Sequence, residues 1–348
     1  MIYKLKELAD IKYGKNQSKV ADINGKYPIY GTGGLMGRSR EYLYNKPSVL
    51  IGRKGTIDKV RYIDVPFWTV DTLFYTIINE KIVCPKYFYY LMQNVDLLQL
   101  NEGTTIPSLR TETLNRIELD VPDKSIQTKV ISLIDKIDDK IALNNKINDN
   151  LAMQVKSLYE DLIKDLDLDN LPRGYKLITL ADIADVQSGK RPSTRVENAD
   201  EINIYPLVGA ASIMGFTNEY NFNEKILVTG RVGTHGIIQR FSTPCWASDN
   251  TLIITSNYYE FTSQVLQHID YRSMNRGSTQ PLITQSDLKK KQVVLPTLER
   301  LNEFEISAST LMAAYDQNVE NNKKLTDLRD TLLPKLMSGE IDVDSIEP

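Results

Sequence analysis

Leu5-Lys6-Glu7-Leu8-Ala9-Asp10-Ile11 lies near the start of the chain, and Leu177-Ile178-Thr179-Leu180-Ala181-Asp182-Ile183 repeats it near the middle of the 348 residues. Four of the seven residue types recur in the same order without a gap, as Leu-Ala-Asp-Ile. A second copy at such a distance indicates an internal duplication, which predicts two modules of the same fold.

The match continues beyond the opening through turn residues and both tryptophans. Spacing between the copies changes by only a few residues, as small loop insertions would produce. The paired positions include Tyr27-Pro28 with Tyr205-Pro206, Gly52-Arg53 with Gly230-Arg231, Gly55-Thr56 with Gly233-Thr234, Trp68 with Trp246, Asp71 with Asp249, and Gly103, Thr105 and Pro107 with Gly277, Thr279 and Pro281.

Each copy is predicted to be an α/β module, residues 1–123 for module 1 and 171–297 for module 2. Runs rich in β-branched and aromatic residues predict strands, amphipathic runs predict helices, and Gly/Pro/Ser/Thr clusters predict loops. The predicted strands are Ser48–Ile51, Phe74–Ile78, Ile117–Val121, Lys225–Thr229, Thr251–Thr255 and Gln292–Leu295; the helices are Cys84–Gln99 and Tyr258–Tyr271; the loops are Asn101–Thr111 and Asn275–Gln285.

A long helix is expected after each module, in residues 124–170 and 298–348. Apolar residues and asparagines recur there at alternating spacings of three and four, which is the seam of a coiled coil. Central asparagines in such a seam fix register and orientation, and they would meet each other if the helices run antiparallel. The predicted seam comprises Ile134, Ile137, Ile141, Asn144, Asn148, Leu151, Leu158, Leu311, Tyr315, Asn318, Asn322 and Leu325.

Charge separates the modules from the helices. The whole chain carries −3, but modules 1 and 2 carry +3 and +2, while the two helical segments carry −2 and −6. Phosphate contact depends on the charge of the domain that makes it, so the modules are the candidate nucleic-acid binders. Two cysteines, no apolar membrane span and no apolar signal core predict a cytoplasmic protein.

The residues do not favour catalysis within this chain. Gly31–Gly37 matches neither the dinucleotide fingerprint nor the phosphate-binding loop, and it reads better as a tight turn. His235 and His268 lack the ligand spacing of a zinc site. Asp138 and Lys140 match a fragment of nuclease sites, but their helix position favours a solvated face.

Three sets of loops are the candidate DNA contacts. The Gly-Arg-x-Gly-Thr turns combine backbone freedom with an arginine fork, although the same arginine could instead pair with Asp71 or Asp249 in a structural turn. The Gly-x-Thr-x-Pro loops and the divergent polar loops offer hydroxyls, amides and cations. The candidates are Lys15, Asn16, Arg38, Arg40, Arg53, Lys54, Thr56, Thr104, Thr105, Arg110, Lys190, Arg191, Arg231, Thr234, His235, Arg276, Ser278, Thr279 and Gln280. A solvated surface position is the simpler alternative for any one cation and for His235.

Taken together, the chain resembles the specificity subunit of Type I restriction-modification enzymes. The resemblance covers nearly the whole chain and includes the repeated opening, both sets of Gly/Thr loops and the closing run Thr331–Ile341. It implies α/β modules plus long helices: target-recognition domains at 1–123 and 171–297, and spacer helices at 124–170 and 298–348. The helices would form an antiparallel coiled coil relating the modules by a pseudo-twofold axis.

The resemblance also implies partners and cofactors. Each module would read one half of a bipartite double-stranded DNA target, and the helices would dock two methyltransferase subunits that hold S-adenosylmethionine and methylate adenine N6. Motor-nuclease subunits would join to cut unmethylated DNA. No cofactor, metal or membrane contact is expected for this chain. A self-contained DNA-modifying or DNA-cleaving enzyme and a coiled-coil adaptor that binds no DNA remain alternatives.

Overall fold

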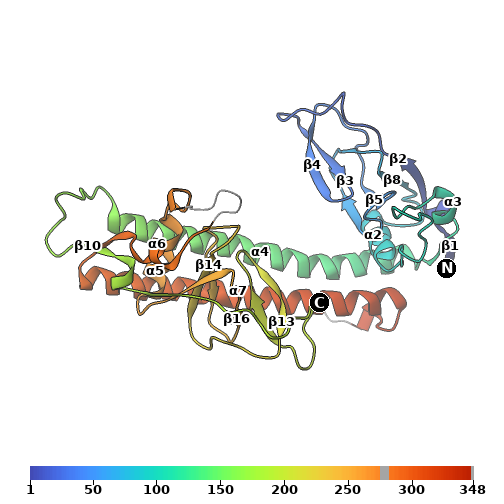
Figure 1. Cartoon of the computed structure of the whole chain (residues 1–348). Coiled ribbons are helices and arrows are strands. Elements are labelled where there is room, and N and C mark those ends of the chain that lie inside the picture. The colour runs from blue at the N-terminus through green and yellow to red at the C-terminus, as the bar shows by residue number, and fades with distance from the viewer. Residues whose placement is uncertain (275–281, 346–348) are drawn as a thin grey trace. The chain divides into compact units, whose positions relative to one another are not determined.

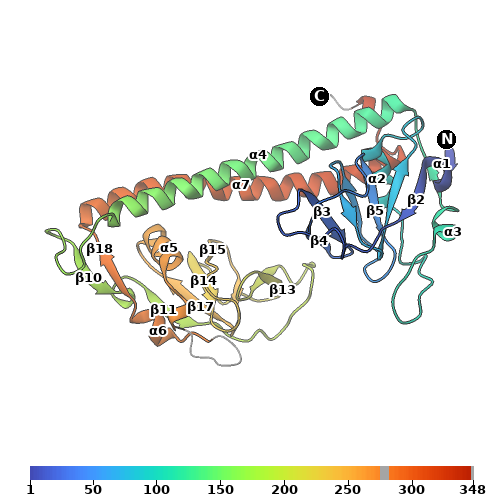
Figure 2. The same ribbon diagram turned by 90° about the horizontal axis from the view of Figure 1, so that it is seen from above.

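A computed structural model describes residues 1–274 and 282–345, and it divides into two compact units. Unit 1 contains 1–143 and 321–348, and unit 2 contains 144–320. Each unit therefore holds one module together with a segment of each long helix, α4 (Lys124–Ile163) and α7 (Leu298–Ser338). Within each unit the two helix segments lie side by side and run antiparallel, as Figures 1 and 2 show.

Module 1 contains a four-stranded antiparallel sheet, a three-stranded sheet and a two-stranded ribbon. The strand orders are β2-β8-β5-β6, β4-β3-β7 and β1-β9, with β3 and β7 parallel. Its elements are β1 (Ile2–Lys4), α1 (Leu5–Leu8), β2 (Ala9–Tyr13), β3 (Tyr27–Gly31), β4 (Gly34–Ser39), β5 (Ser48–Gly52), β6 (Val60–Ile63), β7 (Trp68–Thr69), β8 (Leu73–Ile78), α2 (Pro85–Gln93), α3 (Thr111–Leu114) and β9 (Glu118–Asp120).

Module 2 repeats this plan in the same chain order. Its sheets are β11-β17-β14-β15, β13-β12-β16 and β10-β18, again with one parallel pair, β12 and β16. The elements are β10 (Lys176–Thr179), η1 (Leu180–Asp182), β11 (Asp185–Ser188), β12 (Tyr205–Val208), β13 (Ile213–Thr217), β14 (Ile226–Gly230), β15 (Gln239–Phe241), β16 (Trp246–Ala247), β17 (Thr251–Thr255), α5 (Tyr259–His268), η2 (Arg272–Met274), α6 (Gln285–Lys289) and β18 (Gln292–Leu295); η3 (Val343–Ser345) follows α7. The duplication in the sequence is thus a duplication of topology.

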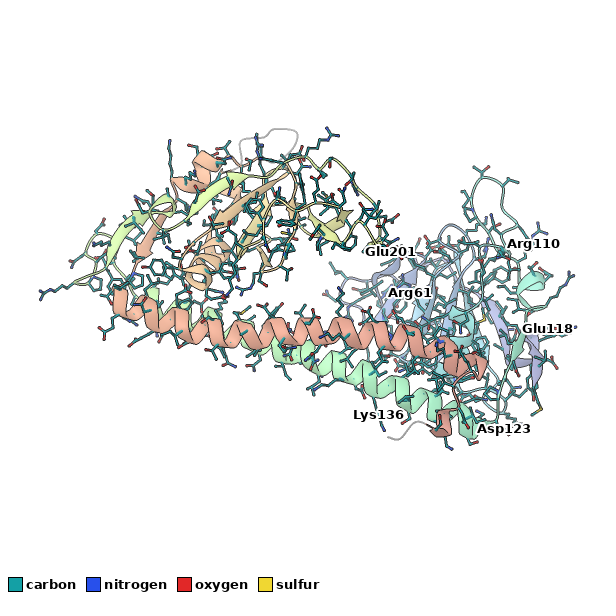
Figure 3. The ribbon with its side chains drawn as sticks, turned by 90° about the horizontal axis from the view of Figure 1, so that it is seen from below. Arg61, Arg110, Glu118, Asp123, Lys136 and Glu201 are labelled. Atoms are coloured by element: carbon teal, nitrogen blue, oxygen red, sulfur yellow. The ribbon has the colours of Figure 1, made fainter. Side chains whose placement is uncertain are left out.

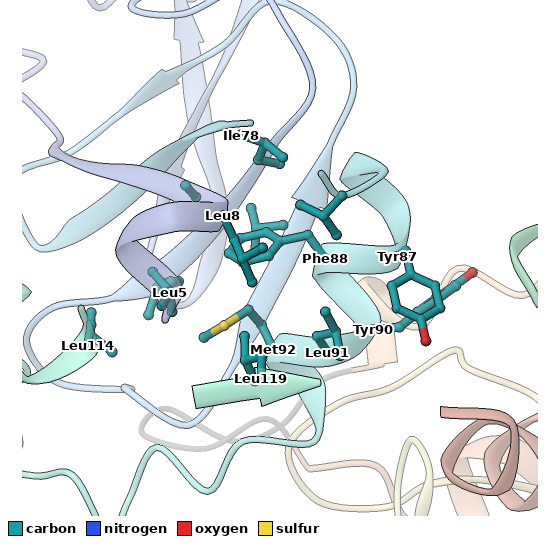
Figure 4. Packing of buried hydrophobic residues seen from close by; sticks show 14 of the residues in the cluster. Leu5, Leu8, Ile78, Tyr87, Phe88, Tyr90, Leu91, Met92, Leu114 and Leu119 are labelled. Carbon is teal, nitrogen blue, oxygen red and sulfur yellow. The ribbon is translucent and has the colours of Figure 1, made fainter. Parts of the chain in front are cut away.

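The repeated Leu-x-x-Leu motif contributes to the core of each module, through Leu5 and Leu8 in module 1 and through Leu180 in module 2, where Leu177 is 41% exposed. Leu5 and Leu8 are fully buried in unit 1 and pack with Phe88 of α2 (Figure 4). The same cluster takes in Val130 and Ile134 of α4, so the module and its helix share one core. In unit 2 the corresponding cluster joins Phe261 of α5 to residues of both long helices. Shared apolar burial of this kind holds each module rigidly on its helix segments.

Three predictions about the helices need correction. The helix predicted at Cys84–Gln99 ends at Gln93, because the Asp96 carboxylate accepts the Leu98 and Gln99 N–H groups and so favours a turn. The helix predicted at Tyr258–Tyr271 ends at His268. Leu158 is 39% exposed, whereas Tyr159 is buried against Phe261 of module 2. A helix of 3.6 residues per turn drifts away from a strict heptad seam, which accounts for this last shift.

Candidate nucleic-acid interface

The four-stranded sheet of module 1 gathers several loops at one end. The register pairs Tyr13 with Phe74, Gly52 with Leu73, and Ile51 with Val60. The segments 14–19, 53–59 and 70–72 therefore leave the sheet at the same edge, which we call the loop edge. Module 2 has the same arrangement, with Ser188 opposite Leu252 and Gly230 opposite Thr251.

The Gly-Arg-Lys-Gly-Thr turn is fastened to the Gly-Thr-Thr-Ile-Pro loop. Gly55 donates its N–H to the Pro107 carbonyl at 2.9 Å, and Leu109 donates to the Arg53 carbonyl at 3.0 Å. A Cβ at Gly52 would lie 2.2 Å from the Thr56 oxygen, so only glycine permits the turn to close. The structure thus brings together two loops that the sequence predicted separately as candidate DNA contacts.

The equivalent turn of module 2 keeps this geometry. Ile283 donates to the Arg231 carbonyl at 3.0 Å, and a Cβ at Gly230 would lie 1.8 Å from the Thr234 oxygen. The predicted contacts Arg276, Ser278, Thr279 and Gln280 lie outside the described residues. The shared backbone geometry explains why glycine and threonine recur while the residue between Arg and Gly changes from Lys54 to Val232.

Arg53 and Arg231 occupy matching places but have different surroundings. Arg53 donates from Nη1 to the backbone carbonyl of Asp71 at 2.8 Å, and its guanidinium lies 5.3 Å from the Tyr13 ring centre. The sequence offered, as an alternative to DNA contact, a structural pairing of Arg53 with Asp71. That pairing is present in part, because Arg53 contacts the backbone carbonyl of Asp71 and not its carboxylate. Within the described residues Arg231 makes no side-chain hydrogen bond. Both arginine residues are half-buried.

The two tryptophans hold the divergent polar loops in place. Trp68 donates from Nε1 to the Lys15 carbonyl at 2.8 Å, and Trp246 donates to the Lys190 carbonyl at 2.7 Å. Gly14 and Gly189 lie where a Cβ would collide with the Val70 and Ser248 carbonyls. The backbone of each polar loop is therefore fixed, while its side chains remain exposed.

Three predicted arginines of module 1 use donors in local structure. Arg38 donates to the Lys26 carbonyl at 3.3 Å and Arg40 to the Lys19 carbonyl at 3.0 Å. Arg110 pairs through Nε with Glu102 at 3.1 Å. The other predicted residues described by the structure are exposed, apart from the half-buried Arg53, Arg231 and His235: Lys15, Asn16, Lys54, Thr56, Thr104, Thr105, Lys190, Arg191 and Thr234.

His235 is not the exposed loop histidine that the sequence suggested. Its Nδ1 lies 3.0 Å from the Gly230 carbonyl, across the turn, and its Nε2 is buried. The side chain therefore braces the Gly-Arg-Val-Gly-Thr turn from inside. Module 1 has Ile57 at this position, fully buried, which fills the same space with an apolar side chain.

The remaining motifs have structural roles. Gly31 pairs with Gly34 to close the β3–β4 hairpin, as the tight-turn interpretation predicted. Asp138, expected on a solvated face, instead accepts from Arg329 of α7 at 2.9 Å. Burial raises the pKa of the Cys245 thiol to about 11, which disfavours the thiolate that nucleophilic chemistry requires.

The described residues contain neither a metal-binding cluster nor a membrane-spanning helix. Residues 1–274 and 282–345 contain no cluster of three or more His, Cys, Asp or Glu side chains arranged to hold a metal ion. None of the helices in this part of the chain is long and apolar enough to cross a bilayer.

The helix seam contains a hydrogen-bonded asparagine pair in unit 2. Asn318 donates to the Asn148 side-chain oxygen at 2.9 Å, and Asn148 donates to the Tyr315 carbonyl at 3.3 Å. Asn148 is buried, as is Asn144. The other predicted seam residues, apart from Leu158, are buried or half-buried: Ile134, Ile137, Ile141, Leu151, Leu311, Tyr315, Asn318, Asn322 and Leu325. A buried amide pair favours one register over its alternatives.

Curated relatives of this chain are named as specificity subunits of Type I restriction enzymes. The chain is 24% identical to the Type I restriction enzyme MjaIX specificity subunit of Methanocaldococcus jannaschii, over 87% of this chain and 80% of that protein. It is 20% identical to the HindI specificity subunit of Haemophilus influenzae, over 80% and 82%.

A solved structure shares the fold. The Type I restriction-modification S subunit from M. genitalium matches with a TM-score of 0.63 and 21% identity, over 97% of this chain and 95% of that one. The family model described as "Type I restriction modification DNA specificity domain" matches residues 1–153 and again 172–328. With two matches that together span most of its length, the chain belongs to this family of DNA specificity domains.

Proposed function

We propose that this chain is the specificity subunit of a Type I restriction-modification enzyme and that each module reads one half of a bipartite DNA target. One observation carries the proposal: a family of DNA specificity domains matches the chain twice, and each match presents the same loop edge with different polar side chains. Loops fixed by shared glycines and tryptophans can change their side chains, and therefore the base edges they recognise, without changing the fold.

The rest of the enzyme is proposed to reside in partner subunits. Two methyltransferase subunits dock on the long helices, hold S-adenosylmethionine and methylate adenine N6, while motor-nuclease subunits cut unmethylated DNA. The chain itself contributes binding and spacing rather than catalysis. The hydrogen-bonded seam pair Asn148–Asn318 supports a fixed helix register, and that register would set the distance between the two half-sites.

Methylation sequencing of host DNA, with and without the gene, tests this function. The expected result is one gene-dependent adenine motif in two parts separated by unspecified bases. Footprinting of the assembled methyltransferase complex should protect both parts. A single uninterrupted motif would overturn the two-reader proposal. Binding of S-adenosylmethionine by the isolated chain would instead indicate a self-contained enzyme.

Replacement of the aligned arginines tests whether each module recognises its own half-site. Arg53→Ala and Arg231→Ala should each weaken recognition of a different half-site, by about 1–3 kcal/mol if the guanidinium contacts a base. The measurement is the affinity for duplexes mutated in one half-site at a time. Unchanged affinity and unchanged salt dependence in both variants would assign the arginines to turn structure alone.

A further inference from the structure

Two cations that the sequence analysis did not single out, Lys59 and Arg61, follow the Gly-Arg-Lys-Gly-Thr turn of module 1 and extend the predicted contact Lys54. Lys54 and Lys59 are exposed, and Arg61 on β6 is half-buried. Within the described residues these three side chains form no hydrogen bond or ion pair. Charged donors that the fold leaves unused are available for an anionic ligand.

The three cations lie close together in the sequence, in the turn between β5 and β6 and at the start of β6, beside the loop edge. Lys54 forms a β-bridge with Ser108 of the neighbouring loop, and Lys59 directly precedes β6. A Cβ at Gly34 would lie 3.4 Å from Nη2 of Arg61, which places that guanidinium against the β3–β4 hairpin. Figure 3 shows Arg61 among the strands of module 1 and Arg110 on a different part of the same module.

Module 2 has the same backbone but no cation at these three positions. Val232, Ile237 and Gln239 replace Lys54, Lys59 and Arg61. The strand register confirms the match, because Arg61 pairs with Leu50 of β5 and Gln239 pairs with Val228 of β14. Gln239 also donates its amide to the Gly209 carbonyl at 2.8 Å, so its donor is used inside the module.

Three exposed basic side chains of module 2 lie in another segment of the loop edge. Lys190, Arg191 and Arg195 are exposed in the polar loop after β11, where module 1 has Lys15 and Lys19. The two modules therefore concentrate positive charge on different segments of one shared scaffold.

We infer that Lys54, Lys59 and Arg61 bind backbone phosphates of the half-site read by module 1, and that module 2 makes no such contact from its matching segment. The inference rests on the proposed DNA-reading function. Phosphate rather than base contact is favoured because two of the three cations are lysines, which act as point charges without the planar fork that reads guanine. Such contacts position the module without specifying sequence.

Salt dependence of DNA affinity tests the inference. The assembled complex of the full chain would be titrated onto the duplex identified by methylation sequencing, at 50–200 mM salt. Each phosphate contact contributes a slope of about −0.9 in log affinity against log salt. The triple variant Lys54→Gln, Lys59→Gln, Arg61→Gln should therefore have a slope shallower by about 2–3 and an unchanged methylated motif.

Two matched variants serve as controls. Lys6→Gln, Lys46→Gln and Lys81→Gln remove the same charge from exposed positions near the other end of the sheet and should leave the slope unchanged. Val232→Lys with Ile237→Lys adds cations to the matching segment of module 2 and should steepen the slope by about 1–2. Thermal unfolding of each variant checks that the fold is intact.

The outcomes separate the inference from the proposed function. Equal slopes for the wild type and the first triple variant, with a wild-type protein that binds its motif, would overturn the inference alone. A changed methylated motif in that variant would assign the segment to base reading and overturn the phosphate contact. A wild-type protein with no methylated motif would overturn the proposed function, and the inference with it.

Discussion

The two modules share a strand order but are fastened to the long helices by different chemistry. In unit 1 the neutral Gln127 of α4 accepts the Cys84 N–H at 2.7 Å, just before α2 begins. In unit 2 the Glu305 carboxylate of α7 accepts the N–H groups of Phe261 and Glu260 in the first turn of α5. A carboxylate at a helix N-terminus is stabilised by the unpaired N–H groups there. Apolar burial maintains the shared fold, whereas the polar contacts between each module and the long helices differ.

The ion pairs on α2 and α5 show the same contrast. Lys86 pairs with Asp135 of α4, and both side chains remain about a third exposed, at 29% and 35%. Arg240 makes two hydrogen bonds to Glu260, at 2.5 and 2.8 Å, and Glu260 is only 4% exposed. The Arg240 guanidinium also lies 4.9 Å from the Tyr259 ring centre. Module 2 therefore depends on buried charge where module 1 uses a solvated pair.

The largest expected difference comes from breaking these two pairs. Arg240→Ala would leave the Glu260 carboxylate buried and unpaired, and should destabilise module 2 by about 3–5 kcal/mol. Lys86→Ala should cost module 1 no more than about 1 kcal/mol, because its partner stays hydrated. Hydrogen exchange at increasing denaturant measures the stability of each module separately. The amides of β14 and β17 report on module 2, and those of β5 and β8 report on module 1. Equal losses of stability in the two variants would contradict the view that module 2 depends on a buried ion pair where module 1 uses a solvated one.

A smaller and symmetric effect is expected at the tryptophans. Trp68→Phe and Trp246→Phe each remove one hydrogen bond to a loop carbonyl, worth about 1 kcal/mol. Amide exchange should accelerate in residues 14–19 for the first variant and in residues 189–195 for the second. Each variant is the control for the other, since the unaltered module should exchange at the wild-type rate. If one substitution accelerated amide exchange in both loops, the two tryptophans would not hold their loops independently.

Much of the fold was predictable because local sequence determines it. The strand predicted at Gln292–Leu295 coincides with β18, and Ser48–Ile51 falls within β5. Runs of β-branched residues bounded by turn residues carry that information in a few positions. The Gly31–Gly34 turn was predictable for the same reason, since glycine is favoured where the backbone makes a tight turn.

The polar contacts were less predictable because their partners lie far apart in the sequence. The pairing of both tryptophans indicated importance, but nothing near Trp68 identified the Lys15 carbonyl as its acceptor. The burial of Arg240 was not predicted, because it depends on Glu260 of α5 and on Asp316 of α7. Arg61 was not predicted because it lies outside the repeated motifs and the polar loops, and its signal is a difference from Gln239 at the matching position of module 2.

The smallest expected difference between the modules is a dependence of stability on pH. Burial raises the pKa of Glu305 above its usual range, opposed by the N–H donors of Phe261 and Glu260. Burial also raises the pKa of Asp316, which the nearby Arg240 opposes. Folded module 2 therefore binds protons more tightly than the unfolded chain does at these sites. The stability they contribute is greatest at low pH and is lost as pH rises through the raised pKa values.

Hydrogen bonds lower the pKa of Asp182 and Asp200, so their opposite contribution is lost only near and below the ordinary aspartate pKa. As pH falls from 7 toward the ordinary glutamate pKa, the Glu305 and Asp316 contribution should dominate, and module 2 should gain stability relative to module 1, which has Ile131 at the position of Glu305.

Glu305→Gln tests this difference directly, with the exposed Glu303→Gln as its control. Glutamine keeps an acceptor for the α5 N-terminus but does not titrate, so the gain on acidification should shrink in the first variant and persist in the second. The measurement is exchange of the β14 and β17 amides at pH 5 and 7, corrected for intrinsic rates. If Glu305→Gln retains the full wild-type gain, the pH dependence originates elsewhere in module 2, because Glu305 would then bind its proton equally in both states.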